Sequence, residues 1–102
     1  MSESLNIALA QLNFLVGDVR GNAARVVASA QRARDELDAH LVLYPELTLC
    51  GYPPEDLLFH RGFRRQIEQG LAAVRSQVTG VSVLVGFPEY SSAGIYNSAA
   101  LI

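Results

Sequence analysis

The sequence has no lysine and no tryptophan, and it has one cysteine and one methionine among its 102 residues. All eight basic residues are arginines, so these residues alone cannot supply a catalytic lysine amine. Cys50 has no partner for a disulfide within the chain, which favours a reducing cytoplasm. The arginines are scattered and the formal net charge is −2, so nothing indicates a nucleic-acid partner or an anionic membrane.

Long apolar runs are also absent. The longest are far too short to span a bilayer, and the polar start of the chain does not resemble a signal peptide, so no membrane partner is expected. The length suits one small domain. Half of the residues are hydrophobic and 18% are charged, which is more apolar than an isolated domain of this size needs.

The first half of the chain predicts a βαβ unit. Leu5–Leu12 alternates large and small residues and is expected to be a strand, placed centrally because its small face allows close packing. Asn22 is expected to cap a helix that ends near 39–40. The apolar run Leu41–Tyr44 is typical of a buried strand, parallel to the first. The predicted inner stripe of the helix is Val26, Val27, Ala30, Ala33 and Leu37.

The second half predicts one more helix and a hairpin. The helix is expected over Gly62–Val78, with Gly70 inside it. Val81–Phe87 predicts a strand, Pro88–Gly94 a turn and Tyr96–Ile102 a last strand that pairs back as a hairpin. Two helices would cover only one face of such a sheet. We therefore expect residues 1–102 to be the first part of a larger α/β domain.

The stretch Leu41–Leu58 has the features of a functional strand end. Pro45 stops the strand because it has no N–H to donate, and Glu46 follows at once. Ligands of open α/β folds bind at such carboxyl ends of strands. Gly51 and two prolines follow in a loop, and the acidic pair at 55 and 56 is expected to start a helix. Glu46 is therefore either a solvated surface charge or a catalytic group.

Three stretches of the chain carry a family resemblance. They are Ile7–Asn13 with Val16-Gly-Asp-Val-Arg-Gly-Asn22, Tyr44-Pro-Glu-Leu-Thr-Leu-Cys-Gly-Tyr-Pro-Pro-Glu-Asp-Leu-Leu58, and Gly86-Phe-Pro88 with Tyr96-Asn-Ser-Ala99. Together they resemble the nitrilase (carbon–nitrogen hydrolase) superfamily. The Gly-Tyr-Pro-Pro-Glu-Asp-Leu continuation is similar to the branch that forms the glutaminase domain of glutamine-dependent NAD synthetases.

The resemblance implies a fold and a mechanism. The fold is the four-layer α-β-β-α sandwich, of which this chain would be the N-terminal part. The family uses a Glu-Lys-Cys triad, in which Glu46 matches the general base. The lysine and the nucleophilic cysteine would lie downstream, so the 102 residues alone are expected to be inactive. A base that acts on a thiol should titrate near neutral pH, and burial at the strand end would favour that.

The resemblance also implies partners. Glutamine would be the substrate, and ammonia would pass to a synthetase domain absent from this chain. That domain would use ATP and magnesium to amidate deamido-NAD. The family's sandwiches pair across a helical face, so a homo-oligomer is expected. A stand-alone amidase or carbamoylase of the same superfamily is the nearer alternative. A non-catalytic α/β fragment that binds or dimerises is the other.

Three further residues have two possible roles. Tyr52 could either line a glutamine pocket beside Glu46 or only pack its own loop. Cys50 is interpreted as a small apolar filler, although a Cys50–His60 dyad of another hydrolase type is the competing hypothesis. The two histidines have no second ligand at metal spacing, so no metal site is predicted.

Overall fold

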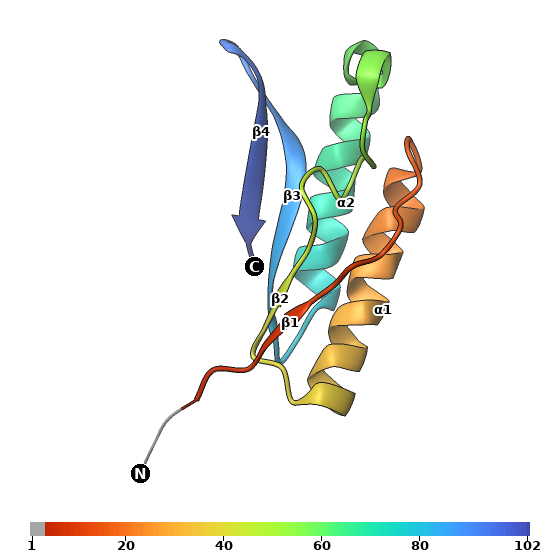
Figure 1. The fold of residues 1–102 in the computed structure, drawn as a ribbon. Coiled ribbons are helices and arrows are strands. Elements are labelled where there is room, and N and C mark those ends of the chain that lie inside the picture. The colour runs from red at the N-terminus through yellow and green to blue at the C-terminus, as the bar shows by residue number, and fades with distance from the viewer. Residues whose placement is uncertain (1–3) are drawn as a thin grey trace.

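The computed structural model describes residues 4–102. Two long helices lie beside a twisted sheet (Figure 1). In chain order the elements are β1 (Ile7–Leu9), α1 (Val19–Leu37), β2 (Leu41–Leu43), the short 3-10 helix η1 (Glu55–Phe59), α2 (Phe63–Gln77), β3 (Ser82–Ser91) and β4 (Gly94–Leu101). Glu55 and Asp56 occupy the first turn of η1, as predicted for a helix start. Within the described residues, no helix is long and apolar enough to cross a membrane.

The four strands follow chain order across the sheet, β1-β2-β3-β4. The β1 and β2 strands are parallel, as are β2 and β3, while β3 and β4 form the antiparallel hairpin. The predicted βαβ unit and hairpin are therefore confirmed. Within residues 4–102 the central position predicted for the first strand is not found, because β1 lies at the edge of this four-stranded sheet. Alternation of large and small residues shows which face of a strand packs inward, but it does not show how many strands flank it.

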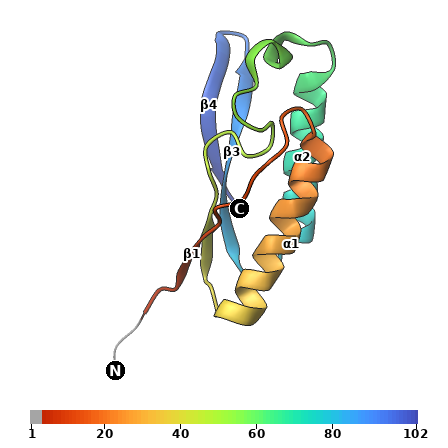
Figure 2. The same cartoon turned by 45° about the vertical axis from the view of Figure 1, so that its right-hand side comes forward.

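Both helices cover the same face of the sheet (Figure 2). Between the helices and the sheet lies a core of fully buried side chains that includes Val26, Val42, Val74, Val83 and Val85. Four of the five residues of the predicted inner stripe of α1 are buried, but Leu37 is 65% exposed. Its helix ends there, since Asp38 adopts the left-handed conformation with φ of 52°.

The two helices pack closely at Gly70 of α2. A Cβ atom at this position would lie 2.8 Å from Cγ1 of Val19 and 3.8 Å from Cβ of Ala23. The glycine therefore lets α1 approach the backbone of α2. A position that is weak for helix formation is here a packing position.

The start of α1 differs from the prediction. Asp18 is the N-cap, and its carboxylate accepts a hydrogen bond from the Gly21 N–H at 3.0 Å. Asn22 lies inside the helix and is buried. Its amide group bonds both backbone groups of Leu15, at 3.0 and 2.8 Å, and donates to the Leu49 carbonyl at 3.0 Å. Asn22 therefore joins the loop before α1 to the loop after β2.

The strand β3 runs through Pro88, where a turn was predicted. Val83 and Ile102 exchange both backbone hydrogen bonds, so this pair is a hydrogen-bonded one. In an antiparallel ladder such pairs alternate with pairs that make no bonds, which places Pro88 and its partner Asn97 in a non-bonded pair. The missing N–H of Pro88 therefore removes no bond to β4, and the strand continues.

The face of the sheet away from the helices carries a row of four leucines. The register aligns Leu9, Leu43, Leu84 and Leu101, one from each strand. Leu9 is 66% exposed and Leu101 is 70% exposed. The predicted uncovered sheet face is therefore confirmed for the described residues.

We expect Asn22→Ala to lower the free energy of unfolding by about 3 kcal/mol, because it leaves the buried carbonyl of Leu49 and two partly buried backbone groups of Leu15 without partners. Asp18→Ala, which removes only a helix cap, should cost about 1 kcal/mol. Urea unfolding at matched protein concentrations measures both variants. Equal losses would contradict the role assigned to Asn22 in joining the two loops.

We also expect the 102-residue chain by itself to self-associate through the leucine row and the free edge of β4. Size-exclusion chromatography with light scattering measures this. Leu101→Asn should shift the chain towards monomer. Leu37→Asn, at a similarly exposed leucine outside the sheet, is the matched control and should not. A monodisperse monomer of the unmodified chain would show this prediction to be wrong.

Candidate functional site

The candidate site lies where the chain leaves β2. The Tyr44 N–H donates to the Leu84 carbonyl of β3 at 3.1 Å, and the Leu49 N–H donates to the Gly86 carbonyl at 3.2 Å. Between these two anchors the chain leaves the regular strand and forms a turn that contains Glu46. The turn is therefore fixed to the sheet at both ends.

Gly86 makes room for this turn. A Cβ atom at position 86 would lie 2.5 Å from the backbone nitrogen of Leu47 and 3.0 Å from Cα of Glu46. Any side chain there would push the turn off β3. The sequence showed Gly86 only as part of a motif, and its spatial reason becomes visible only in the folded chain.

The Glu46 carboxylate contacts a residue from the other end of the sheet. Its Oε2 accepts a hydrogen bond from Nδ2 of Asn97 at 3.2 Å. Within residues 4–102 no cation pairs with Glu46, and Oε1 has no hydrogen bond. One carboxylate oxygen is thus held and the other is open. The side chain is exposed, so the burial expected at this strand end does not occur within the described residues.

A groove of about 490 Å³ adjoins the Glu46–Asn97 pair. Its walls include Leu47 from the turn, Leu58 and Phe59 from η1, and Ile95 and Asn97 from β4. The hydroxyl of Tyr90 donates to the Leu58 carbonyl at 2.7 Å, which holds η1 against the hairpin. The groove is therefore mostly apolar, with Asn97 and Tyr96 as its polar side chains, and it is bounded by two elements that are joined by a hydrogen bond.

Tyr44 fixes the strand end from the helix side. Its hydroxyl donates to the Val26 carbonyl at 2.9 Å and lies 2.6 Å from Oγ of Ser29. Burial raises the pKa of Tyr44, so the group stays a neutral donor. Its ring packs edge-on against Phe14. Tyr44, two positions before Glu46, is thus held against α1 by hydrogen bonds.

Tyr52 has no hydrogen bond to Glu46 within residues 4–102, and its side chain is 65% exposed. The preceding Gly51 packs against the loop before α1, where a Cβ atom would lie 2.6 Å from Cα of Val16. Its φ of 77° also favours glycine. The pocket-lining role of Tyr52 therefore stays a prediction.

Cys50 is fully buried, and its thiol lies 3.2 Å from the carbonyl oxygen of Gly51. Burial raises the pKa of this thiol to about 11. His60 is exposed and has no hydrogen bond to Cys50 within the described residues. The competing Cys50–His60 dyad is therefore wrong, because a thiol buried and protonated at neutral pH is a poor nucleophile. The interpretation of Cys50 as an apolar filler is confirmed.

His40 also has a structural contact, since its Nδ1 accepts from the Asn6 N–H at 2.9 Å. Across residues 4–102 no group of three or more histidine, cysteine, aspartate or glutamate side chains could hold a metal ion.

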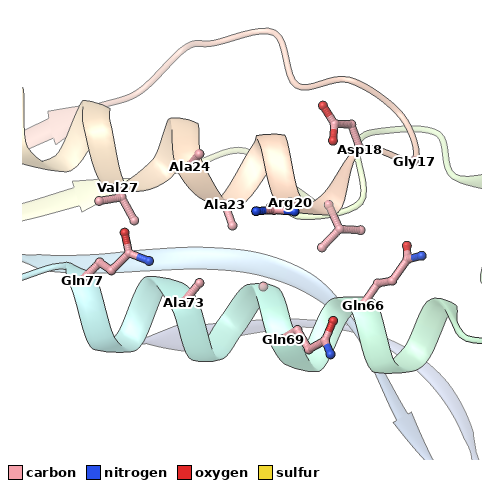
Figure 3. A pocket seen from close by; sticks show the side chains of 12 residues that line it. Gly17, Asp18, Arg20, Ala23, Ala24, Val27, Gln66, Gln69, Ala73 and Gln77 are labelled. Atoms are coloured by element: carbon pink, nitrogen blue, oxygen red, sulfur yellow. The ribbon is translucent and has the colours of Figure 1, made fainter.

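A second hollow of about 620 Å³ lies between α1 and α2. In Figure 3 the small residues Ala23, Ala24 and Ala73 lie along it, with Gln66 and Gln69 on the α2 side. Its lining includes the charged Asp18 and Arg20 at one end but no cysteine, serine, threonine or lysine. Glu46 lies elsewhere, so the larger hollow is not the candidate site.

The sequence pattern did not indicate that Asn97 contacts Glu46. By its residues alone, Tyr96-Asn97-Ser98 is typical of a hairpin strand with a polar edge. The only signal in the sequence was the motif that contains it, because 51 residues separate Asn97 from its partner Glu46.

Three comparisons with known proteins bear on this site. The profile of the carbon-nitrogen hydrolase family matches residues 6–102. The chain is 42% identical over 101 residues to a glutamine-dependent NAD(+) synthetase of Xanthomonas campestris, covering 99% of this chain and 18% of that protein. A similar protein of Aquifex aeolicus is 39% identical over 96% of this chain and 17% of its own length. The chain thus spans about a fifth of the length of the curated relatives it matches.

Solved structures agree in fold. The glutamine-dependent NAD+ synthetase of Acinetobacter baumannii superposes with a TM-score of 0.90 at 33% identity, over 98% of this chain and 19% of that chain. An amidase from Nesterenkonia sp. superposes with a TM-score of 0.82 at 25% identity, over 95% of this chain and 37% of that chain. The predicted nitrilase-type α/β architecture is therefore confirmed for this part of the fold.

We expect Cys50→Ala to cost about 1 kcal/mol in the free energy of unfolding. Because the pKa of the thiol is raised to about 11, native protein should react slowly with a disulfide reagent at pH 8 and faster as the pH rises. Unfolded protein, with an ordinary thiol, should react rapidly at pH 8. The chain has a single cysteine, so the signal reports on Cys50 alone. Fast modification of native protein at neutral pH would contradict the structural role.

Proposed function

This chain belongs to the carbon-nitrogen hydrolase family, and from that premise we propose that it carries the general base of a glutaminase site in a glutamine-dependent NAD synthetase. The observation that carries the proposal is the similarity to curated synthetases over 99% of the chain. The placement of Glu46 supports it, since the carboxylate stands at a strand end with one oxygen open.

In the proposed reaction, Glu46 takes the proton of a cysteine thiol supplied from outside these residues. The thiolate attacks the amide carbon of glutamine. The carbon–nitrogen bond breaks as the proton passes to the leaving group, which gives ammonia and a thioester. Water then hydrolyses the thioester to glutamate and restores the thiol. Cys50 is not this nucleophile, because it is buried and hydrogen-bonded to its own loop.

The ammonia is proposed to pass to a separate synthetase domain that uses ATP and magnesium to amidate deamido-NAD. Within residues 4–102 no group of three or more histidine, cysteine, aspartate or glutamate side chains could hold the magnesium. In this proposal the chain contributes to the release of ammonia and not to the ATP-dependent step. The 102 residues by themselves are expected to be inactive, because they lack the lysine and a reactive cysteine.

The cellular compartment and the assembly of the protein belong to the same proposal. We place it in the cytoplasm as a homo-oligomer of α-β-β-α sandwiches. The apolar row of leucines supports the sandwich, because such a sheet face needs a second layer to cover it. The free thiol of Cys50 is consistent with a reducing compartment.

A stand-alone amidase is the alternative. The similarity to the Nesterenkonia amidase favours it, with a TM-score of 0.82, but the 25% identity there is well below the 42% found with a synthetase. An assay of the full-length protein with glutamine and deamido-NAD against simple aliphatic amides separates the two functions.

We expect Glu46→Gln in the full-length protein to lower glutamine-dependent NAD synthesis by about 100-fold or more, because the variant keeps the shape but cannot accept the proton. Synthesis from free ammonia should continue, since it bypasses the glutaminase step. Steady-state rates with each nitrogen source measure this.

Glu89→Gln is the matched control, because Glu89 is also an exposed carboxylate with one side-chain hydrogen bond, to Ser98 at 2.8 Å. It should leave both activities unchanged. If Glu46→Gln reduced synthesis from glutamine and from ammonia equally, Glu46 would not be the base of the glutaminase step.

A further inference from the structure

We propose that Asn97 is a positioning residue that sets which oxygen of Glu46 is free to accept the proton. This inference rests on the proposed glutaminase function. It assigns a role to a residue of β4 that the motif around Glu46 does not contain.

Asn97 contacts the Glu46 carboxylate directly. Nδ2 of Asn97 donates to Oε2 of Glu46 at 3.2 Å. It is the one hydrogen bond that the Glu46 side chain makes within residues 4–102, and no arginine pairs with the carboxylate there. An exposed glutamate with three side-chain torsions otherwise samples many positions. The amide of Asn97 is thus the group that limits them.

Asn97 binds the Glu46 carboxylate through an uncharged amide group. Nδ2 of asparagine carries no charge and only donates, so it binds one carboxylate oxygen without neutralising the group. An arginine at this position would engage both oxygens and favour the ionised form. The bond to Oε2 leaves Oε1 with an open lone pair, which is what a base needs.

Both residues of the Glu46–Asn97 hydrogen bond are held in place by the sheet. The turn with Glu46 is anchored to β3 by the bonds to Leu84 and Gly86. Asn97 lies opposite Pro88 in the β3–β4 ladder. Gly86 and Pro88, two apart on one strand, share the face on which the pair meets, and neither has a long side chain that would separate Glu46 from Asn97. A base held between two fixed elements keeps its geometry through the reaction.

Asn97 also lines the groove beside Glu46. The amide is therefore at the border between the base and the space in which a substrate could lie. A residue that served only to finish a strand edge would not need to face this groove.

The test uses Asn97→Leu in the full-length protein, which keeps the size but removes the donor. We expect kcat for glutamine-dependent synthesis to fall about tenfold, which is about 1.4 kcal/mol, with little change in the KM for glutamine. Ammonia-dependent synthesis should be unchanged. Asn97→Thr suits an exposed strand position and has a hydroxyl too short to replace the bond. It should show the same loss, and it decides the question if the leucine variant folds poorly.

Two controls separate positioning from a structural role. Ser98→Ala, on the same strand, removes a hydrogen bond that does not reach Glu46, and it should leave kcat unchanged. In a Glu46→Gln background, Asn97→Thr should cause no further loss, because no base remains to be oriented.

The outcomes are distinct. A normal kcat in both Asn97 variants, with the expected large loss of glutamine-dependent activity in Glu46→Gln, overturns the positioning role and leaves the proposed function standing. Losses that simply multiply in the double variant also overturn it, because Asn97 would then act independently of Glu46. Full glutamine-dependent activity in Glu46→Gln overturns both the function of Glu46 and this inference.

Discussion

The structure of the candidate site depends on one close approach, that of the turn after β2 to the backbone of β3. Two hydrogen bonds, from Tyr44 to Leu84 and from Leu49 to Gly86, fix the ends of this turn. The missing side chain of Gly86 lets the turn lie against the strand. Without that approach Glu46 would move away from the sheet and from Asn97. The position of one carboxylate is therefore set by backbone bonds and by a glycine.

The two faces of the sheet differ in what covers them within the described residues. The face under α1 and α2 is a complete core of buried valines and alanines, which stabilises this part of the fold. The opposite face carries a row of leucines, and its β3–β4 end carries the Glu46–Asn97 pair. The Glu46–Asn97 pair and the uncovered apolar surface thus share one side. A second layer on that face would exclude water from the Glu46 carboxylate as well as from the leucines.

The chain has no lysine, and its single thiol is buried between carbonyl groups of its own loop. What the described residues contribute to the proposed glutaminase site is the Glu46 carboxylate, its hydrogen-bond donor Asn97 and the wall of an adjoining groove. Tyr44 and Asn22 support this arrangement from the helix side, because each bonds the backbone of a neighbouring element.

The sequence by itself determined the order of the elements, because hydrophobic periodicity and glycine and proline positions are local signals. It also indicated Glu46 as a candidate, because a carboxylate directly after a buried strand and a proline is a local pattern, although only the family resemblance favoured a catalytic role over a surface charge. Only the tertiary structure decided that β1 lies at the edge, that Asp18 rather than Asn22 caps α1, and that β3 continues through Pro88. It alone brought Asn97 to Glu46 and showed why Gly86 is a glycine. Each of these depends on contacts between residues far apart in the chain, which no local pattern records.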